Sequence, residues 1–133
     1  MKRFSATIVF LIFTIGSSFL AFAQDKLTFE DVMMFEDITQ SSISDQGNWL
    51  MYTVAPDRGD ARVVVQSVSG TLKYEVMMAS FPAMSTDEAW VAARTQASLN
   101  QRLNNQRNAP KNGMAILSTE DGSLERIDSV ARF

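Results

Sequence analysis

The residues best suited to chemistry in this chain occur in two matching sets. Each set has a serine, an acidic residue and a tryptophan: Ser44, Asp45 and Trp49 in the first, and Ser85, Asp87 and Trp90 in the second. Such residues suggest nucleophilic attack by serine, calcium binding by carboxylates, or stacking of a sugar on the tryptophans. Nucleophilic attack by the serine of a Ser-His-Asp triad is excluded within this chain because the chain contains no His. Such a triad needs an imidazole to take the proton from the serine.

No other motif supports a reactive site. The chain has no G-x-S-x-G sequence and no D-x-D-x-D-G calcium loop, and its six Gly residues are scattered rather than gathered in a phosphate-binding loop. With neither His nor Cys, a zinc site would depend on carboxylates alone, which is unusual. We therefore predict no catalytic, cofactor-binding or metal-binding residue in this chain.

We interpret the matching sets as a structural repeat. Ile43–Leu50 and Met84–Val91 share the order apolar residue, Ser, polar turn, Trp and aliphatic residue, with an offset of 41 residues. This offset is within the range of four-stranded β-propeller blades, and a repeated fold produces matching tryptophans without any ligand. We expect Trp49 and Trp90 to pack between neighbouring sheets, and the two acidic residues to bond backbone N–H groups in turns.

Each repeat unit is expected to contain four strands joined by tight turns. In the first unit, about residues 38–77, we predict strands at 41–44, 49–54, 62–68 and 71–76. In the second unit, about residues 80–130, we predict strands at 81–85, 89–95, 114–119 and 124–130. Aromatic and β-branched runs between Gly-containing turns are typical of such strands. Val63-Val64-Val65 indicates a strand that is buried on both faces.

The offset between the two units grows along the chain. It rises from 41 to 52 residues when Val64 is matched to Ile116 and Gly70 to Gly122, which predicts that eleven residues are inserted between the second and third strands. With the same offset, Phe133 would open a third unit. Because a domain rarely leaves such an edge unpaired, we expect the chain to be a truncated N-terminal portion of a longer protein.

The insertion, residues 96–113, is polar. Leu99 and Leu103 are four residues apart, which predicts one or two turns of helix before Pro110. Four basic residues lie in or beside it: Arg94, Arg102, Arg107 and Lys111. Binding of nucleic acid or of a protein partner is one interpretation, but we expect a solvated loop at the rim, because loops that carry no packing vary freely.

The first 23 residues have the features of a signal peptide. Lys2 and Arg3 precede an apolar stretch over residues 6–22, and Ala21-Phe22-Ala23 fits the cleavage rule, which places the cut before Gln24. The alternative is an uncleaved membrane anchor; a lipoprotein anchor is excluded because the chain has no Cys. We predict an exported protein, periplasmic or secreted, with no stable membrane anchor after cleavage.

A short helix is predicted from Thr28 to about Phe35. Thr28 can cap its first turn, and Asp31 lies three residues later, at the positive end of the helix dipole. We interpret this helix as a lead-in that packs on the rim of the sheets. The alternative, a docking or membrane-surface helix, would require basic residues that the segment does not have.

The charge of the chain argues against nucleic acid as a partner. The formal net charge is −3, and it becomes −5 when the predicted signal peptide is removed with its two basic residues. Nucleic-acid-binding domains usually present a basic face. Since Cys is absent, no disulfide stabilises the chain, and its stability must come from packing.

Several segments resemble the opening of exported bacterial peptidases of the prolyl oligopeptidase family. They are Leu27–Met33, Ile43–Tyr52, Pro56–Asp60 and, for the second blade, Lys111–Leu117. The resemblance implies an all-β fold, a partial β-propeller over residues 24–133 with about two blades. It also implies a downstream α/β-hydrolase domain that carries Ser, Asp and His. In such proteins the propeller caps the hydrolase domain and admits short peptide substrates, so the residues of this chain would be scaffold.

This sequence departs from the family pattern in its turns. Gln46 stands where Asp or Lys is common, and the turn at 86–89 has lost its glycine. Two other functions stay open. One is a non-enzymatic periplasmic propeller of the TolB type that binds a protein or glycan partner, and the other is a free-standing module of two β-sheets.

Overall fold

A computed structural model describes residues 26–105, 107–108 and 110–130. The predicted signal peptide lies outside these residues. Within the described part of the chain, no helix is long and apolar enough to cross a membrane.

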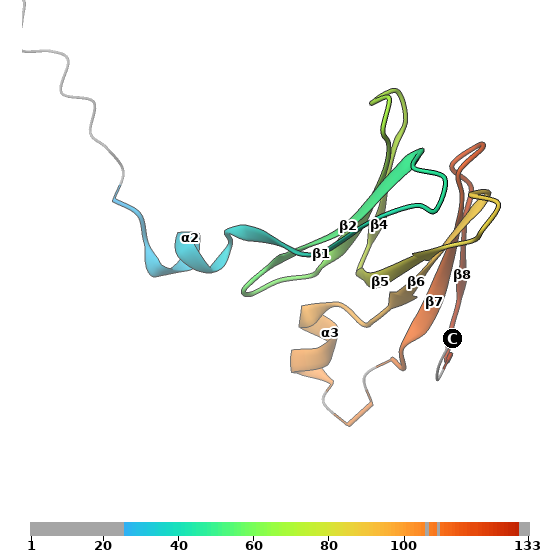
Figure 1. Cartoon of the computed structure of the whole chain (residues 1–133). Helices are drawn as coiled ribbons and strands as arrows, with labels where there is room; N and C mark the ends of the chain where they lie inside the picture. The colour runs from blue at the N-terminus through green and yellow to red at the C-terminus, as the bar shows by residue number, and fades with distance from the viewer. Residues whose placement is uncertain (1–25, 106, 109, 131–133) are drawn as a thin grey trace, which may run out of the picture.

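The fold consists of two four-stranded antiparallel sheets, each formed by strands that are consecutive in sequence (Figure 1). The first sheet contains β1 (Glu36–Ile43), β2 (Trp49–Pro56), β3 (Arg62–Ser67) and β4 (Lys73–Met77). The second sheet contains β5 (Ala79–Met84), β6 (Trp90–Thr95), β7 (Gly113–Ser118) and β8 (Leu124–Ile127). The prediction of an all-β fold with four strands in each unit is confirmed.

The largest differences between predicted and observed strand ends are at β1 and β8, and the other ends agree within two residues. β1 begins at Glu36, well before the predicted start at Ser41, because its polar first half continues the ladder along β2 as far as Pro56. β8 ends at Ile127 instead of Val130, after pairing with Met114 of β7. The alternation of buried and exposed residues could not reveal the first half of β1, since every residue of β1 is exposed.

Both predicted helices are present and short. In α2 (Phe29–Met33), the Thr28 side chain accepts a hydrogen bond from the Asp31 amide, and the Asp31 carboxylate accepts one from the Thr28 amide. In α3 (Leu99–Asn104), Ser98 and Gln101 form the same reciprocal cap. Neither helix buries a residue. The lead-in is tied to the β2–β3 turn by the Arg58 amide, which donates to the Met33 carbonyl over 3.1 Å.

The core lies between the two sheets. It consists of Met51, Val63, Val65 and Val76 from the first sheet, and Ala79, Val91, Ala93, Ala115 and Leu117 from the second. Val64, whose side chain points to the opposite face of β3, is also 1% exposed. The prediction that β3 is buried on both faces is therefore confirmed. A single residue, Met78, separates β4 from β5 and has a left-handed φ of 56°.

The strand pairing corrects the register that the sequence suggested. In each sheet the tryptophan that opens the second strand faces the serine that ends the third: Trp49 with Ser67, and Trp90 with Ser118. The tryptophans are 41 residues apart and the serines 51, so ten residues are inserted instead of eleven. Val64 corresponds to Ala115, and the predicted match with Ile116 is wrong.

The difference of one residue comes from where the glycine lies within two turns of equal length, because Gln66 pairs with Lys73 and Leu117 with Leu124 at the same separation. The Gly70 amide bonds to the carbonyl of Ser67, three residues back, whereas the Gly122 amide bonds to Ser118, four residues back. Both glycines are left-handed, with φ of 77° and 73°. Aligning them adds one residue to the offset because Gly122 lies one position later in its turn than Gly70 does. The prediction that Phe133 opens a third unit lies outside the described residues.

Candidate functional site

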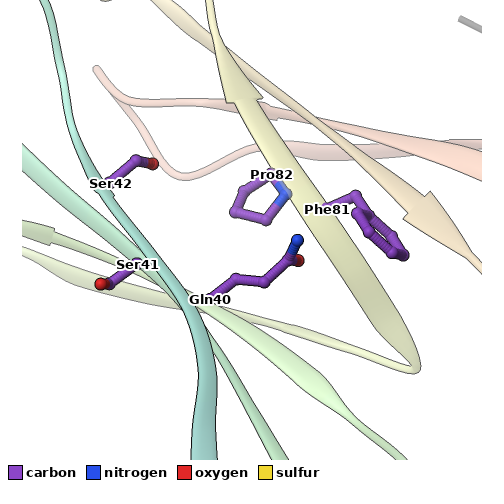
Figure 2. A pocket seen from close by; sticks show the side chains of 5 residues that line it. All are labelled: Gln40, Ser41, Ser42, Phe81 and Pro82. Atoms are coloured by element: carbon purple, nitrogen blue, oxygen red, sulfur yellow. The ribbon is translucent and has the colours of Figure 1, made fainter.

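A shallow hollow of about 220 Å³ lies between the edge strands β1 and β5 (Figure 2). It is lined by Gln40, Ser41, Ser42, Phe81 and Pro82. Figure 2 shows Gln40 of β1 and Pro82 of β5 pointing toward one another across the hollow, with Ser41 directed away. The sequence did not single out these residues, because the hollow exists only where two separate sheets meet.

The lining of the hollow is uncharged. None of its lining residues has a carboxylate, imidazole, thiol or amine. Acid–base chemistry and metal binding therefore have no suitable group there. Since sites for small organic ligands are usually about 300–1,000 Å³, this hollow suits a single side chain better than a whole ligand.

Phe81 is held on the far side of β5. The Arg94 guanidinium carbon lies 4.6 Å from the centre of the Phe81 ring, a cation–π contact. Phe81 has a left-handed φ of 56°, and the register between β5 and β6 shifts between Ser80 and Ala83. This irregular backbone turns Pro82 toward β1.

The two tryptophans do not form a sugar-binding pair. Trp49 stacks on Tyr74 with ring centres 6.2 Å apart and packs against the core between the sheets. Trp90 is next to the buried Val91 and so points to the opposite face of the second sheet, where it is 50% exposed. The expected packing between sheets therefore holds for Trp49, whereas in the described residues Trp90 has no sheet over it.

The predicted turn acids do not gather into a metal site. The Ala89 amide donates to the Asp87 carboxylate over 3.1 Å, as expected for a turn residue, and the Ser85 hydroxyl donates to the same oxygen. Both hydrogen bonds hold the pKa of Asp87 below its ordinary value, and the bond from Ser85 has the larger effect. The described residues contain no group of three or more potential metal ligands.

One further acidic residue, Glu88, was not singled out by comparison of the two repeat units. It occupies the position of Gly47 and shares its left-handed backbone, with φ of 58° against 80°. Its carboxylate accepts hydrogen bonds from the Gln46 amide, at 3.1 Å, and from the Asn48 side-chain amide, at 2.8 Å. Glu88 is 7% exposed. We call this contact between the two turns the turn clamp.

The turn clamp favours the ionised form of Glu88. A hydrogen bond from the Ser44 side chain is the largest cause that holds the pKa of Glu88 below its ordinary value, and bonds from Asn48 and the Gln46 amide act in the same direction. Comparing the two turns in the sequence shows only that the second turn has lost its glycine. The feature that could have identified Glu88 is a carboxylate at a position where the left-handed backbone disfavours a Cβ.

Other hydrogen bonds also join the two sheets. The Tyr74 hydroxyl donates to the Thr119 carbonyl over 3.2 Å, and the Arg126 guanidinium donates to the Met77 carbonyl over 2.9 Å. The predicted loop insertion is tied to the first sheet as well, because the Leu99 amide at the start of α3 donates to the Asp60 carboxylate over 2.6 Å. These polar groups are structural, since each one is already paired within the chain.

Comparison of the chain with known protein families, with curated proteins and with solved structures gives no match.

Proposed function

We propose that this chain is the non-catalytic N-terminal segment of a β-propeller in an exported serine peptidase of the prolyl oligopeptidase type, which hydrolyses short peptides. The sequence resemblance supports the peptidase part of the proposal. The observation that carries the propeller part is the match between the buried face of the first sheet and the outer face of the second.

The buried face of the first sheet has a counterpart that is only partly covered. Six residues of the first sheet form the face that packs on the second: Trp49, Met51, Val63, Val65, Tyr74 and Val76. With offsets of 41 and 51 residues, their counterparts on the outer face of the second sheet are Trp90, Ala92, Met114, Ile116, Glu125 and Ile127. Trp90 and Ile127 are 50% and 38% exposed. The outer face thus keeps an apolar pattern that suits another sheet.

The decisive experiment determines the gene sequence downstream of the segment that encodes this chain, and then assays the whole protein. The proposal expects a G-x-S-x-G motif and a later His, labelling of that serine by a fluorophosphonate probe, and cleavage of short chromogenic peptides. The matched control is the alanine variant of that serine, which should lose both labelling and cleavage.

Two other results would overturn parts of the proposal. Further Ser-turn-Trp units followed by a stop codon, without a hydrolase domain, would replace the peptidase with a non-enzymatic propeller that binds a protein or glycan. A downstream sequence without either feature would also overturn the propeller.

A further inference from the structure

Four strands form the edges of the two sheets, and they differ in how they are protected from pairing with another chain. β4 has five residues and presents Lys73 and Glu75, and β8 has only four residues, including Glu125 and Arg126. Charged side chains and short length are common ways of blocking an edge strand. β5 is blocked differently, by Pro82 within the strand and by its register shift.

β1 lacks most of this protection. It has eight residues, all exposed, and contains no proline. Its charged residues, Glu36 and Asp37, lie in its first half, and a register shift between Ile38 and Gln40 separates that half from the second. The regular, uncharged edge is therefore the segment from Gln40 to Ile43.

The pairing of β1 with β2 shows which backbone groups remain available. The Ser44 amide donates to the Trp49 carbonyl, so this pair is hydrogen-bonded. Hydrogen-bonded pairs alternate with non-bonded pairs in an antiparallel ladder. The backbone groups of Ser41 and Ile43 consequently point away from β2, toward the open side of the sheet. They can pair with an added strand without disturbing the ladder.

The hollow lies beside this same segment. Gln40, Ser41 and Ser42 form one side of it, and Phe81 and Pro82 of β5 form the other (Figure 2). Gln40 and Ser42 pair with Thr53 and Met51 of β2, so their side chains share the face that is directed at the second sheet. A strand added next to β1 would place alternate side chains on that face, and one of them would enter the hollow.

We propose that the edge of β1 from Gln40 to Ile43 binds an extended peptide segment by strand addition, with one small uncharged side chain in the hollow. Main-chain hydrogen bonds to Ser41 and Ile43 supply the affinity, and the hollow supplies the selectivity. A charged side chain is disfavoured because the lining offers no opposite charge. This inference rests on the geometry of β1 and of the hollow beside it, and it does not depend on the proposed peptidase.

The size of the edge favours a peptide over a second copy of the chain. Four regular residues span about 13 Å at roughly 3.3 Å per residue. Pairing over this length would bury much less than the roughly 1,600 Å² of a standard stable interface.

Hydrogen–deuterium exchange of the full chain tests the proposal. The probe is the acetylated and amidated peptide Thr-Val-Thr-Val-Thr-Val, and the control peptide has the same sequence with alternate amides N-methylated. The proposal expects the probe to slow exchange at the Ser41 and Ile43 amides by tenfold or more. The Gln40 and Ser42 amides, already in the ladder, should change little, and the control peptide should have no effect.

Two variants make the test specific. Ser41→Pro removes the free amide and should weaken peptide binding at least tenfold, whereas Ser41→Ala retains the amide and should bind normally. If Ser41→Pro does not fold, Gln40→Lys serves instead, because it places a charge in the hollow and leaves the backbone intact.

The proposal is overturned if the probe protects no β1 amide, or if it binds Ser41→Pro or Gln40→Lys as well as the unmodified chain. Protection of Ser41 and Ile43 that appears without peptide and rises with protein concentration would identify a second copy as the occupant, and would also overturn it.

Discussion

The carboxylate of Glu88 accepts a 2.8 Å hydrogen bond from the side-chain amide of Asn48, and this bond joins corresponding turns of the two sheets. Glu88 makes it from a left-handed backbone conformation, which costs a residue with a Cβ roughly 1–2 kcal/mol. The contact between the sheets offsets this cost.

Replacing Glu88 should separate these two effects. Glu88→Ala loses the turn clamp but keeps the unfavourable backbone, so we expect the free energy of unfolding to fall by about 1–3 kcal/mol. Glu88→Gly loses the clamp but relieves the backbone, and should be about 1 kcal/mol more stable than Glu88→Ala. Urea denaturation of both variants measures the difference. Equal stability of the two variants would show that the left-handed backbone carries no cost.

The turn clamp should weaken in acid. The pKa of Glu88 is held below its ordinary value of 4.5, chiefly by the Ser44 side chain. The stabilisation is therefore complete above about pH 4.5, and it is lost as the pH falls through the lower pKa of the folded protein. Glu88→Gln serves as the reference. The stability gap between the two proteins should be constant above that pH and shrink below it, and a gap that stays constant down to pH 2 would contradict the assignment.

The pKa of Asp121 provides an internal contrast for this experiment. A hydrogen bond from the Ser123 amide is the largest of the contacts that lower it to about 2. Protonation of Asp121 thus belongs to a more acidic range than that of an ordinary carboxylate. The turn around Asp121 should therefore stay unchanged until the pH falls well below 3.8, the ordinary value for an aspartate.

Two glycines with nearly the same backbone should respond differently to alanine. A Cβ on Gly70, with φ of 77°, would have no neighbour within 4 Å, whereas a Cβ on Gly122, with φ of 73°, would lie 2.5 Å from Cε1 of Tyr74. Gly70→Ala should cost about 1–2 kcal/mol from the backbone alone. Gly122→Ala should cost a further 1–3 kcal/mol from the clash. Thermal or urea unfolding measures both.

The extra cost at Gly122 should disappear when Tyr74 is shortened. In a Tyr74→Ala background, Gly122→Ala and Gly70→Ala should destabilise the chain by similar amounts. A difference that persists would show that something other than the contact with Tyr74 causes it.

The tryptophans should also differ. Trp49→Ala removes a ring that packs on Tyr74 and on the core between the sheets, and should cost at least about 2 kcal/mol. Trp90 is 50% exposed, so Trp90→Ala should cost less than about 1 kcal/mol in this chain. In a longer protein with a further sheet on this face, the cost at Trp90 should approach that at Trp49. Equal costs in the present chain would contradict the arrangement described.

Local patterns predicted the strands and helices that local chemistry determines. The valine run gave β3, and Thr28 with Asp31 gave the cap of α2. Local sequence patterns did not predict structure that depends on pairing with another strand. The first half of β1 is polar and exposed, and it is a strand because it continues the ladder along β2.

The candidate sites were less accessible to sequence reasoning. The hollow depends on how β5 approaches β1, which no spacing within one segment encodes. In the sequence, Glu88 looked only like the loss of a turn glycine. The residues that hydrogen-bond to its carboxylate, Gln46 and Asn48, lie in the other repeat unit. The register error at Gly122 has a simpler cause, since the glycine lies one position later in this turn than in the turn of the first sheet.

The one-residue link at Met78 has a consequence for how the chain acquires its structure. Every ladder in the described residues joins strands that are neighbours in sequence, so the first sheet can be complete once Met77 has emerged from the ribosome. Low sequence separation between paired strands favours rapid folding. Because only Met78 follows before β5 begins, the finished sheet is already beside the emerging one and can serve as the surface on which the second sheet forms.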